Sequence, residues 1–190
     1  MKESFIVLDY LPNGHPMDPR PLHLREPLIQ GIVCETLVLL ELIPVKDYAP
    51  KVQDEIDVED KAKIYKVKSR IYMRNLTHGA KVELEYAIQK IIDENEPRFI
   101  DFYNTATPIT TRLHSLELIP GVGKKHMWDI INARKIKKFE SFDDLKARIR
   151  LLPDPKKGLV QRIIDEFDEK DRYNLFVMPP KRTFQERGRF

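Results

Sequence analysis

Residues 118–131 read LIPGVGKKHMWDII, and this stretch decides the fold of the second half of the chain. Pro120 and Gly121 fit the two central positions of a type II turn, because proline fixes a negative φ and glycine accepts the positive φ that follows. The apolar residues on both sides indicate helices that pack on one another. The stretch therefore predicts a helix, a tight turn and a second helix.

Gly123 stands where the second of these helices begins. A glycine there leaves the first amides of the helix uncovered, and these N–H groups, with the positive end of the helix dipole, form a binding place for a phosphate. Lys124 and Lys125 add positive charge at its rim. We therefore predict phosphate binding here. The alternative is a purely structural hairpin, since Pro-Gly turns between helices are common.

The pattern recurs once. RIRLLPDPKKGLVQRII aligns with LELIPGVGKKHMWDII when Pro153 is placed on Pro120, an offset of 33, which indicates a tandem duplication. The second copy carries Asp154, Pro155 and Lys156 in place of the two glycines and the valine between them. Asp154 before Pro155 predicts an N-cap, so that a carboxylate occupies the place of a phosphate. We expect the second hairpin to be structural.

The first copy resembles the helix-hairpin-helix motif of DNA- and RNA-binding proteins that do not read sequence. In that family the turn presents its amides to the nucleic-acid backbone. The resemblance implies this role for Gly121, Val122, Gly123, Lys124 and Lys125.

A wider resemblance covers nearly the whole chain. The order EPLIQ, LLELIP, a helix after NLT, PITTRLHSLELIPGVGKKHMW, FESFDDL and YNLFV resembles an uncharacterised archaeal family, domain of unknown function 655. The resemblance implies an N-terminal barrel of the oligonucleotide-binding type joined to a helix-hairpin-helix domain. It brings no established activity with it.

The first half predicts a small β-barrel. SFIVLDYL is a strand, PLIQGIVCETLVLLELIPV is one long strand or two consecutive ones with Gly31 at a bend or bulge, and residues 55–58 form another. KIYKVKSRIYM alternates as a half-buried strand does, with Tyr65 and Val67 on its apolar face. Several short strands in close succession favour an antiparallel meander that curls into a closed or nearly closed barrel.

Helices follow the strands. Thr77 is the expected N-cap of a helix whose apolar stripe includes Ala80 and Leu84, and Ser141 begins another helix with acidic residues in its first turn. We interpret the polar residues 105–111 as a linker. The chain is thus predicted to be α+β, with a barrel-like domain and its helices at 1–104, an all-α tandem helix-hairpin-helix domain at 105–177, and a basic tail at 178–190 that is disordered unless a partner orders it.

Charge is divided unequally along the chain. Residues 1–104 carry 14 Lys/Arg against 18 Asp/Glu, and residues 105–190 carry 19 against 12. A basic cluster after the first hairpin either touches a second phosphate or complements the C-terminus of its helix. The cluster consists of Arg134, Lys135, Lys137 and Lys138. A second candidate nucleic-acid face, on the barrel, consists of Lys66, Lys68, Arg70 and Tyr72, although the negative charge of that half argues against it.

Other side chains point to no further site. Met127 and Trp128 follow the hairpin at helical spacing and are more typical of a core than of a base-stacking platform. The five histidines lack metal-ligand spacing and Cys34 is alone, so we expect no metal and no cofactor.

No catalytic motif is present either. Asp143 or Asp144 lies where helix-hairpin-helix glycosylases carry a catalytic aspartate, but the acidic first turn of a helix explains both. We therefore expect no enzymatic activity.

These observations favour a non-catalytic protein that binds RNA or DNA through backbone phosphates, largely without regard to sequence. The alternative hypothesis is a protein adaptor of a ribonucleoprotein, ribosomal or tRNA-processing assembly. No apolar run approaches the roughly 20 residues of a membrane span, and the apolar stretch at residues 5–8 is too short for a secretory signal. We expect a cytoplasmic protein without membrane contact.

Overall fold

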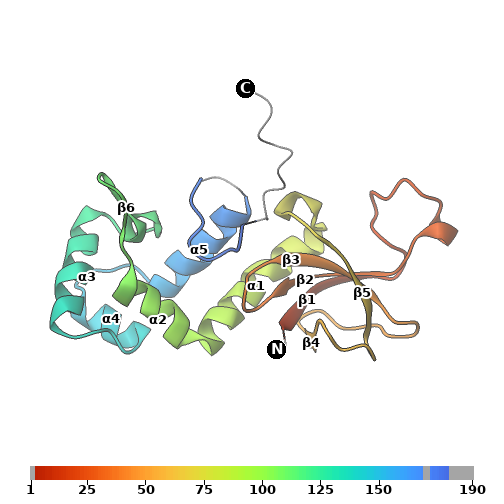
Figure 1. Cartoon of the computed structure of the whole chain (residues 1–190), viewed down its shortest axis with the longest axis horizontal. Coiled ribbons are helices and arrows are strands. Elements are labelled where there is room, and N and C mark those ends of the chain that lie inside the picture. Colours follow the sequence, from red (N-terminus) through yellow and green to blue (C-terminus); the bar gives the residue numbers. More distant parts are fainter. Residues whose placement is uncertain (1–2, 169–171, 180–190) are drawn as a thin grey trace, which may run out of the picture.

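A computed structural model describes residues 3–168 and 172–179. The protein is α+β, with strands first and helices after them (Figure 1). The first part contains β1 (Ser4–Leu11), η1 (Leu22–Leu24), β2 (Leu28–Val33), β3 (Leu39–Pro44), β4 (Glu55–Asp57), β5 (Ile64–Arg70) and η2 (Met73–Asn75). The rest contains α1 (His78–Glu94), α2 (Glu96–Thr105), β6 (Pro108–Thr110), β7 (Leu113–His114), η3 (Ser115–Leu118), α3 (Lys124–Ile136), α4 (Phe142–Arg148) and α5 (Pro155–Phe167).

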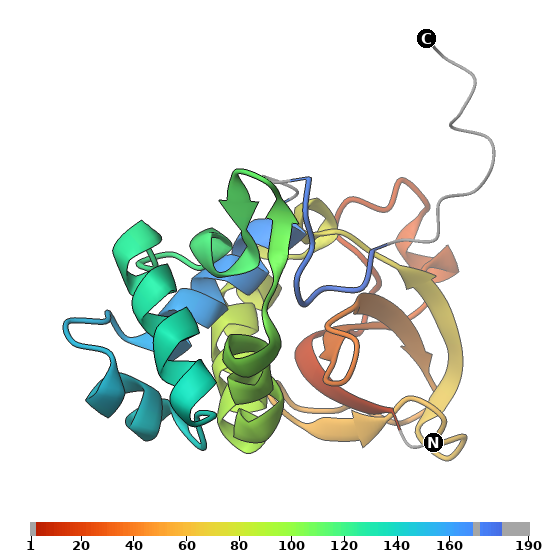
Figure 2. The same cartoon turned by 60° about the vertical axis from the view of Figure 1, so that its left-hand side comes forward.

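The first five strands form one antiparallel sheet in the order β4-β1-β2-β3-β5. The sheet curls into a half-barrel (Figure 2), with β4 and β5 at its two edges. The long apolar stretch after Pro27 is therefore two strands, β2 and β3. The turn between them places Leu37 at a positive φ of 51° and buries its side chain.

Both faces of the sheet are buried along β1 and β2, which explains why their sequences are almost continuously apolar. One apolar cluster draws on all five strands and on no helix, as expected inside a curled sheet; it includes Phe5, Val7 and Ile29. The alternate residues Ile6 and Ile32 belong to a second cluster on the opposite face, toward α1.

Gly31 pairs with Val7 next to a β-bulge, but the bulge lies in β1, between Val7 and Asp9. The prediction of a bend or bulge at Gly31 itself was therefore wrong. Gly31 is required for a different reason: a Cβ here would lie 2.3 Å from the carbonyl oxygen of Ile6 and 2.4 Å from the ring of Phe5. The glycine lets the Phe5 ring lie directly against the backbone of β2.

Gly31→Ala is expected to lower the free energy of unfolding by about 1–3 kcal/mol, because the sheet must shift to admit the methyl group. Urea unfolding followed by circular dichroism measures the change. Gly79→Ala, an exposed position in the first turn of α1 with its nearest neighbour at 3.7 Å, is the matched control and should be neutral or slightly stabilising. Equal stabilities of the two variants would contradict the close contact of Phe5 with Gly31.

The expectation of a half-buried β5 is wrong. Tyr65 and Val67, placed on its apolar face, are 64% and 48% exposed. Among the strands of the described residues, β5 is a sheet edge that pairs with β3 alone, and two irregularities in that pairing interrupt the alternation of faces.

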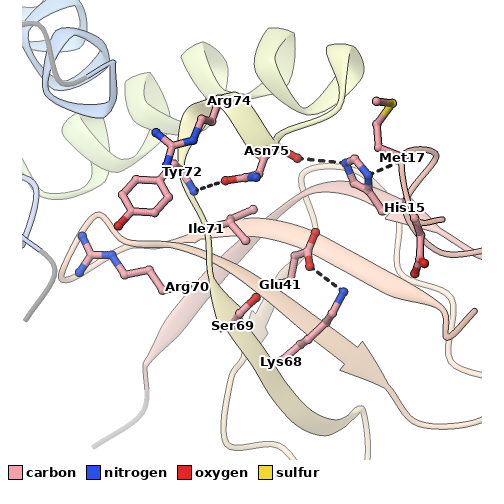
Figure 3. Close-up of a pocket in the computed structure, with 11 residues that line it drawn as sticks. His15, Met17, Glu41, Lys68, Ser69, Arg70, Ile71, Tyr72, Arg74 and Asn75 are labelled. Atoms are coloured by element: carbon pink, nitrogen blue, oxygen red, sulfur yellow. Dashed lines mark hydrogen bonds and ion pairs between the residues drawn. The ribbon is translucent and has the colours of Figure 1, made fainter. Parts of the chain in front are cut away.

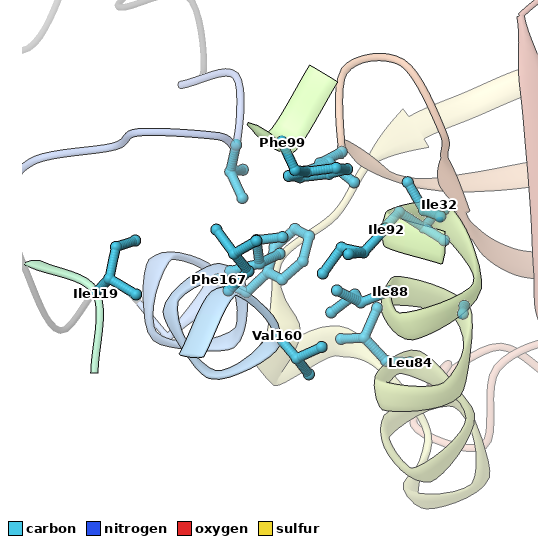
Figure 4. Close-up of a cluster of buried hydrophobic side chains, with 14 of the residues drawn as sticks. Ile32, Leu84, Ile88, Ile92, Phe99, Ile119, Val160 and Phe167 are labelled. Carbon is cyan, nitrogen blue, oxygen red and sulfur yellow. The ribbon is translucent and has the colours of Figure 1, made fainter. Parts of the chain in front are cut away.

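Helix α1 joins the sheet to the remaining helices. Its N-cap is Thr77 as predicted, since the Thr77 hydroxyl accepts a hydrogen bond from the amide of Ala80 at 3.0 Å. The apolar stripe of α1 is buried between the sheet and α5, and the same cluster continues to Ile119, Val160 and Phe167 (Figure 4). A single hydrophobic core thus connects the half-barrel to the C-terminal helices.

Residues 105–111 are not a plain linker. Part of this stretch is β6, which pairs with β7 as a short ribbon before the first hairpin, so the second half is not helical throughout.

Farther along, Val177 is buried in the core and the Met178 amide donates to the carbonyl of Thr36 at 3.1 Å. Most of the predicted tail, residues 180–190, lies outside the described residues. No helix in the described part of the chain is long and apolar enough to cross a membrane.

Candidate nucleic-acid interface

The turn between η3 and α3 has the geometry predicted from Pro120 and Gly121. The Val122 amide donates to the Ile119 carbonyl at 2.9 Å, and Gly121 has a φ of 89°. A Cβ on Gly121 would approach Pro153 at 3.0 Å, so this glycine also allows the second hairpin to pack closely against the first. The type II turn is confirmed.

Gly123 is the N-cap of α3 and provides no side-chain cap. The amides of Lys124, Lys125 and His126 have no hydrogen-bond acceptor within residues 3–168 and 172–179, and a Cβ built on Gly123 would meet no atom within 4 Å. Three amides, two of them on lysines, therefore open toward solvent at the positive end of a 13-residue helix.

Val122 does not share this role. Its side chain is buried and its amide is occupied by the Ile119 carbonyl, so this predicted binding residue positions the turn and offers no free donor.

Three other helix starts in the described chain are closed by side chains, whereas α2, like α3, has no side-chain cap at its N-cap residue, Asn95. Thr77 caps α1, Ser141 accepts from the amide of Asp144 at 3.1 Å at α4, and Asp154 accepts from the amide of Lys156 at 3.0 Å at α5. The predicted caps at Ser141 and Asp154 are confirmed. Phosphate would compete with a carboxylate at α5, whereas α3 presents no competing group.

The second hairpin has a different register from the one predicted. Its turn places Leu151 at a positive φ of 61°, the conformation that Gly121 adopts in the first turn, and the Leu152 amide points back to the Ile149 carbonyl. Leu151 therefore corresponds to Gly121, and the alignment of Pro120 with Pro153 does not superimpose the turns. The two hairpins pack through Gly158, where a Cβ would lie 2.9 Å from the Pro120 carbonyl.

The guanidinium of Arg134 is engaged within the protein. It donates to the carbonyls of Tyr103 at 2.9 Å and Ala106 at 2.7 Å, so it joins α3 to the C-terminal end of α2. Arg134 therefore complements the end of α2 and not the end of its own helix. Its side chain also lines a groove beside α3, and contact with a phosphate stays a prediction. The carbonyls at the end of α3 are instead served by Arg148, which donates to Ala133 at 2.7 Å.

The lysines of the same cluster remain at the surface. Lys135, Lys137 and Lys138 are exposed, and Lys137 pairs with Glu140 at 3.0 Å. An exposed pair of this kind contributes little and leaves the lysine available to exchange partners.

Two of the cations predicted on the barrel face, Lys68 and Arg70, line a pocket of about 560 Å³ beside β5 (Figure 3). Lys68 forms an ion pair with Glu41 at 3.0 Å, and Glu41 also accepts from the buried Gln30. Arg70 donates to the Met178 carbonyl. The pocket is therefore lined by cations that already have partners within the protein.

The remaining members of this face are engaged in a similar way. Tyr72 lies under the guanidinium of Arg74, 4.4 Å from the ring centroid, and Lys66 lies 3.8 Å from Glu26 outside the pocket. Phosphate binding here would require breaking several internal contacts, whereas binding at α3 would break none of those described.

Trp128 is 57% exposed, and its assignment to the core was wrong. Met127 beside it is buried as predicted. Because successive helix positions differ by about 100°, burial of Met127 turns Trp128 toward the surface, over a groove formed with the β6–β7 ribbon. The sequence analysis did not predict the exposed ring or the ribbon. The four-residue spacing of Lys124 and Trp128 could have indicated that the two side chains share one exposed face of the helix.

Both aspartates that were considered for catalysis occupy the positions expected for the acidic first turn of a helix. Asp143 and Asp144 lie in the first turn of α4, and Asp144 forms an ion pair with Arg148 at 3.1 Å.

Burial raises the pKa of the half-buried Cys34 thiol to about 11. Within the described ranges, no group of three or more His, Cys, Asp or Glu side chains is arranged to hold a metal ion.

The comparisons with known proteins agree with the resemblance of the whole chain to domain of unknown function 655. A family described as protein of unknown function (DUF655) matches residues 1–178. The chain is 41% identical over 175 residues to uncharacterized protein MJ0038 of Methanocaldococcus jannaschii, covering 90% of this chain and 77% of that one. It is also similar to the crystal structure of Af1531 from Archaeoglobus fulgidus, with a TM-score of 0.83 and 43% identity over 93% of this chain and 100% of the other.

Proposed function

We propose that this chain, which belongs to the DUF655 family, binds RNA or DNA through backbone phosphates, without catalysis and largely without regard to base sequence. The observation that carries the proposal is the uncapped start of α3, where Lys124, Lys125 and His126 present free amides beside Gly123, which has no side chain to cover them. Phosphate oxygens are common to every nucleotide, so a site made of amides and lysines does not discriminate between sequences.

Two features of the fold support the proposal. The turn and helix start of residues 119–124 support assignment of the first hairpin to the helix-hairpin-helix motif. The curled sheet of five short strands, open between its β4 and β5 edges, supports a small barrel of the oligonucleotide-binding type, although its β3–β5 pairing is antiparallel. The net charge of the second half, which is positive, favours a polyanion on the helical side.

The salt dependence of oligonucleotide binding tests this function. Neutralising a few phosphates predicts a log–log slope of about −2 to −4, so doubling the salt should weaken binding roughly 4- to 16-fold. Fluorescence anisotropy of a labelled single strand and of its duplex, each measured over a series of KCl concentrations, gives the slope. A flat response, or no binding at low salt, would contradict phosphate recognition.

A second candidate function is docking onto a protein of a ribonucleoprotein assembly. It is favoured by the loop between β1 and β2, where Met17, Leu22 and Leu24 are exposed. Purification from native extract, with and without nuclease, separates the two functions. Stoichiometric proteins retained after nuclease treatment favour docking, and nucleic acid that is lost on treatment favours direct binding.

A further inference from the structure

A groove of about 700 Å³ lies between the β6–β7 ribbon and α3. Its apolar walls include Trp128 and Ile131 from α3 and Pro108 and Leu113 from the ribbon. Lys124, whose amide is one of the free donors at the start of α3, also lines it. The groove and the proposed phosphate site are therefore adjacent, separated by a single turn of helix, about 6 Å along its axis.

Trp128 supplies a flat surface in this groove. The core positions of α3 are taken by Met127 and Ile130, which leaves the indole more than half exposed. An exposed aromatic ring next to a cation is the arrangement with which proteins stack unpaired bases, because every base has an aromatic face.

His114 gives the groove a fixed hydrogen-bond donor. It is only 7% exposed, and its Nδ1 accepts from the Leu116 amide at 3.1 Å, so the ring proton lies on Nε2. Nε2 has no partner within the described residues, yet it is not sealed from solvent. Burial and the nearby Arg134 lower the pKa of His114, which keeps the ring neutral and this tautomer in place near pH 7.

Glu117 gives the groove an acceptor. Its Oε1 accepts from the His114 amide at 2.9 Å, which holds the carboxylate next to the imidazole, and its Oε2 has no partner in the described part of the chain. A purely apolar groove would fit many partners. A donor and an acceptor that line the same groove as an exposed aromatic ring can match the edge and the face of a nucleobase.

We infer that this groove holds one unpaired nucleobase of the strand whose phosphate binds at the start of α3. Trp128 stacks on the base, His114 Nε2 donates to a carbonyl or ring nitrogen, and Glu117 accepts from an N–H on the base edge. The inference rests on the proposed function and adds to it that single strands, or duplexes with an extruded base, bind in preference to intact duplex.

Trp128 is the only tryptophan in the chain, so its fluorescence reports directly on the groove. The probes are a short oligothymidylate, an abasic strand with the same number of phosphates, and a duplex of equal length. Oligothymidylate should quench the emission on binding, while the abasic strand and the duplex should bind, as followed by anisotropy, and leave the emission unchanged.

Variants of Trp128 add an affinity measurement. Trp128→Leu should weaken oligothymidylate binding by about 5- to 100-fold and leave abasic-strand and duplex binding unchanged, whereas Trp128→Phe should retain most of the affinity. The side chain is exposed, and unchanged circular dichroism will show that the variants fold.

The outcomes separate the two proposals. If all three probes bind with equal affinity and none quenches the emission, the groove holds no base and the phosphate site stands. If no probe binds, both proposals fail. Quenching by an extract protein that persists after nuclease treatment, with none by oligothymidylate, would assign the groove to a protein partner and overturn the inference.

Discussion

Gly123→Glu is expected to weaken the binding of every oligonucleotide, single-stranded, abasic or duplex, by about a hundredfold. The new carboxylate would stand beside the uncapped amides of Lys124, Lys125 and His126, where the proposed site takes a phosphate. Hydrogen bonds to a charged group contribute roughly 1.5–3 kcal/mol, and repulsion between the carboxylate and the phosphate adds to their loss. Together these effects reach about 3 kcal/mol, which corresponds to the expected hundredfold change.

The same substitution at Gly79 is the matched control. Gly79 is also exposed and also lies at a helix start, but Thr77 already caps that helix. Gly79→Glu changes the net charge equally, so it should alter affinity less than about twofold. Anisotropy titrations of both variants decide the matter, with circular dichroism as the check on folding. Unchanged affinity of Gly123→Glu, or an equal loss in the two variants, would show that the start of α3 is not the binding place.

The sequence predicts the turn of the first hairpin and the helix caps well, because each of these features depends on residues close together in the chain. Pro120 and Gly121 determine the turn through their own allowed φ values. Ser141 and Asp154 cap helices through amides two or three residues away. Such features need no knowledge of the rest of the chain.

Long-range packing decides what the sequence could not predict. Arg134 reads as a solvent cation, but carbonyls of Tyr103 and Ala106, about 30 residues earlier, take its donors. Trp128 reads as a core residue, but the core side of its helix is filled by Met127 and Ile130. The direction of a side chain depends here on which neighbouring residues pack against its helix, and periodicity alone does not identify those neighbours.

Glu166 is a buried residue whose role the sequence did not reveal. Glu166→Gln is expected to lower the free energy of unfolding by about 3–5 kcal/mol. Its carboxylate is fully buried in α5 and forms an ion pair with the buried Arg162 at 2.9 Å. The same carboxylate accepts from the amides of Leu175 at 2.8 Å, Phe176 at 3.0 Å and Val177 at 2.9 Å. One side chain thus fixes the segment that follows α5.

Glutamine has the shape of glutamate but only one acceptor oxygen. Its NH₂ group would face amide donors in place of the second oxygen, and Arg162 would lose the charge that compensates its own. Because Phe176 packs on Phe99 and Phe102, with ring centroids 5.8 and 4.9 Å apart, the loss extends to the core between α2 and the C-terminal segment.

Urea unfolding followed by far-ultraviolet circular dichroism measures this loss of stability. The control is Glu85→Gln, because Glu85 is exposed on α1, and it should change the free energy of unfolding by less than about 0.5 kcal/mol. Hydrogen exchange adds a local measurement, because the amides of Leu175, Phe176 and Val177 should lose protection before the strands do. A loss below about 1 kcal/mol, with these amides still protected, would mean that the C-terminal segment is held by its apolar side chains alone. The buried carboxylate would then be dispensable for anchoring the chain between the second hairpin and the sheet.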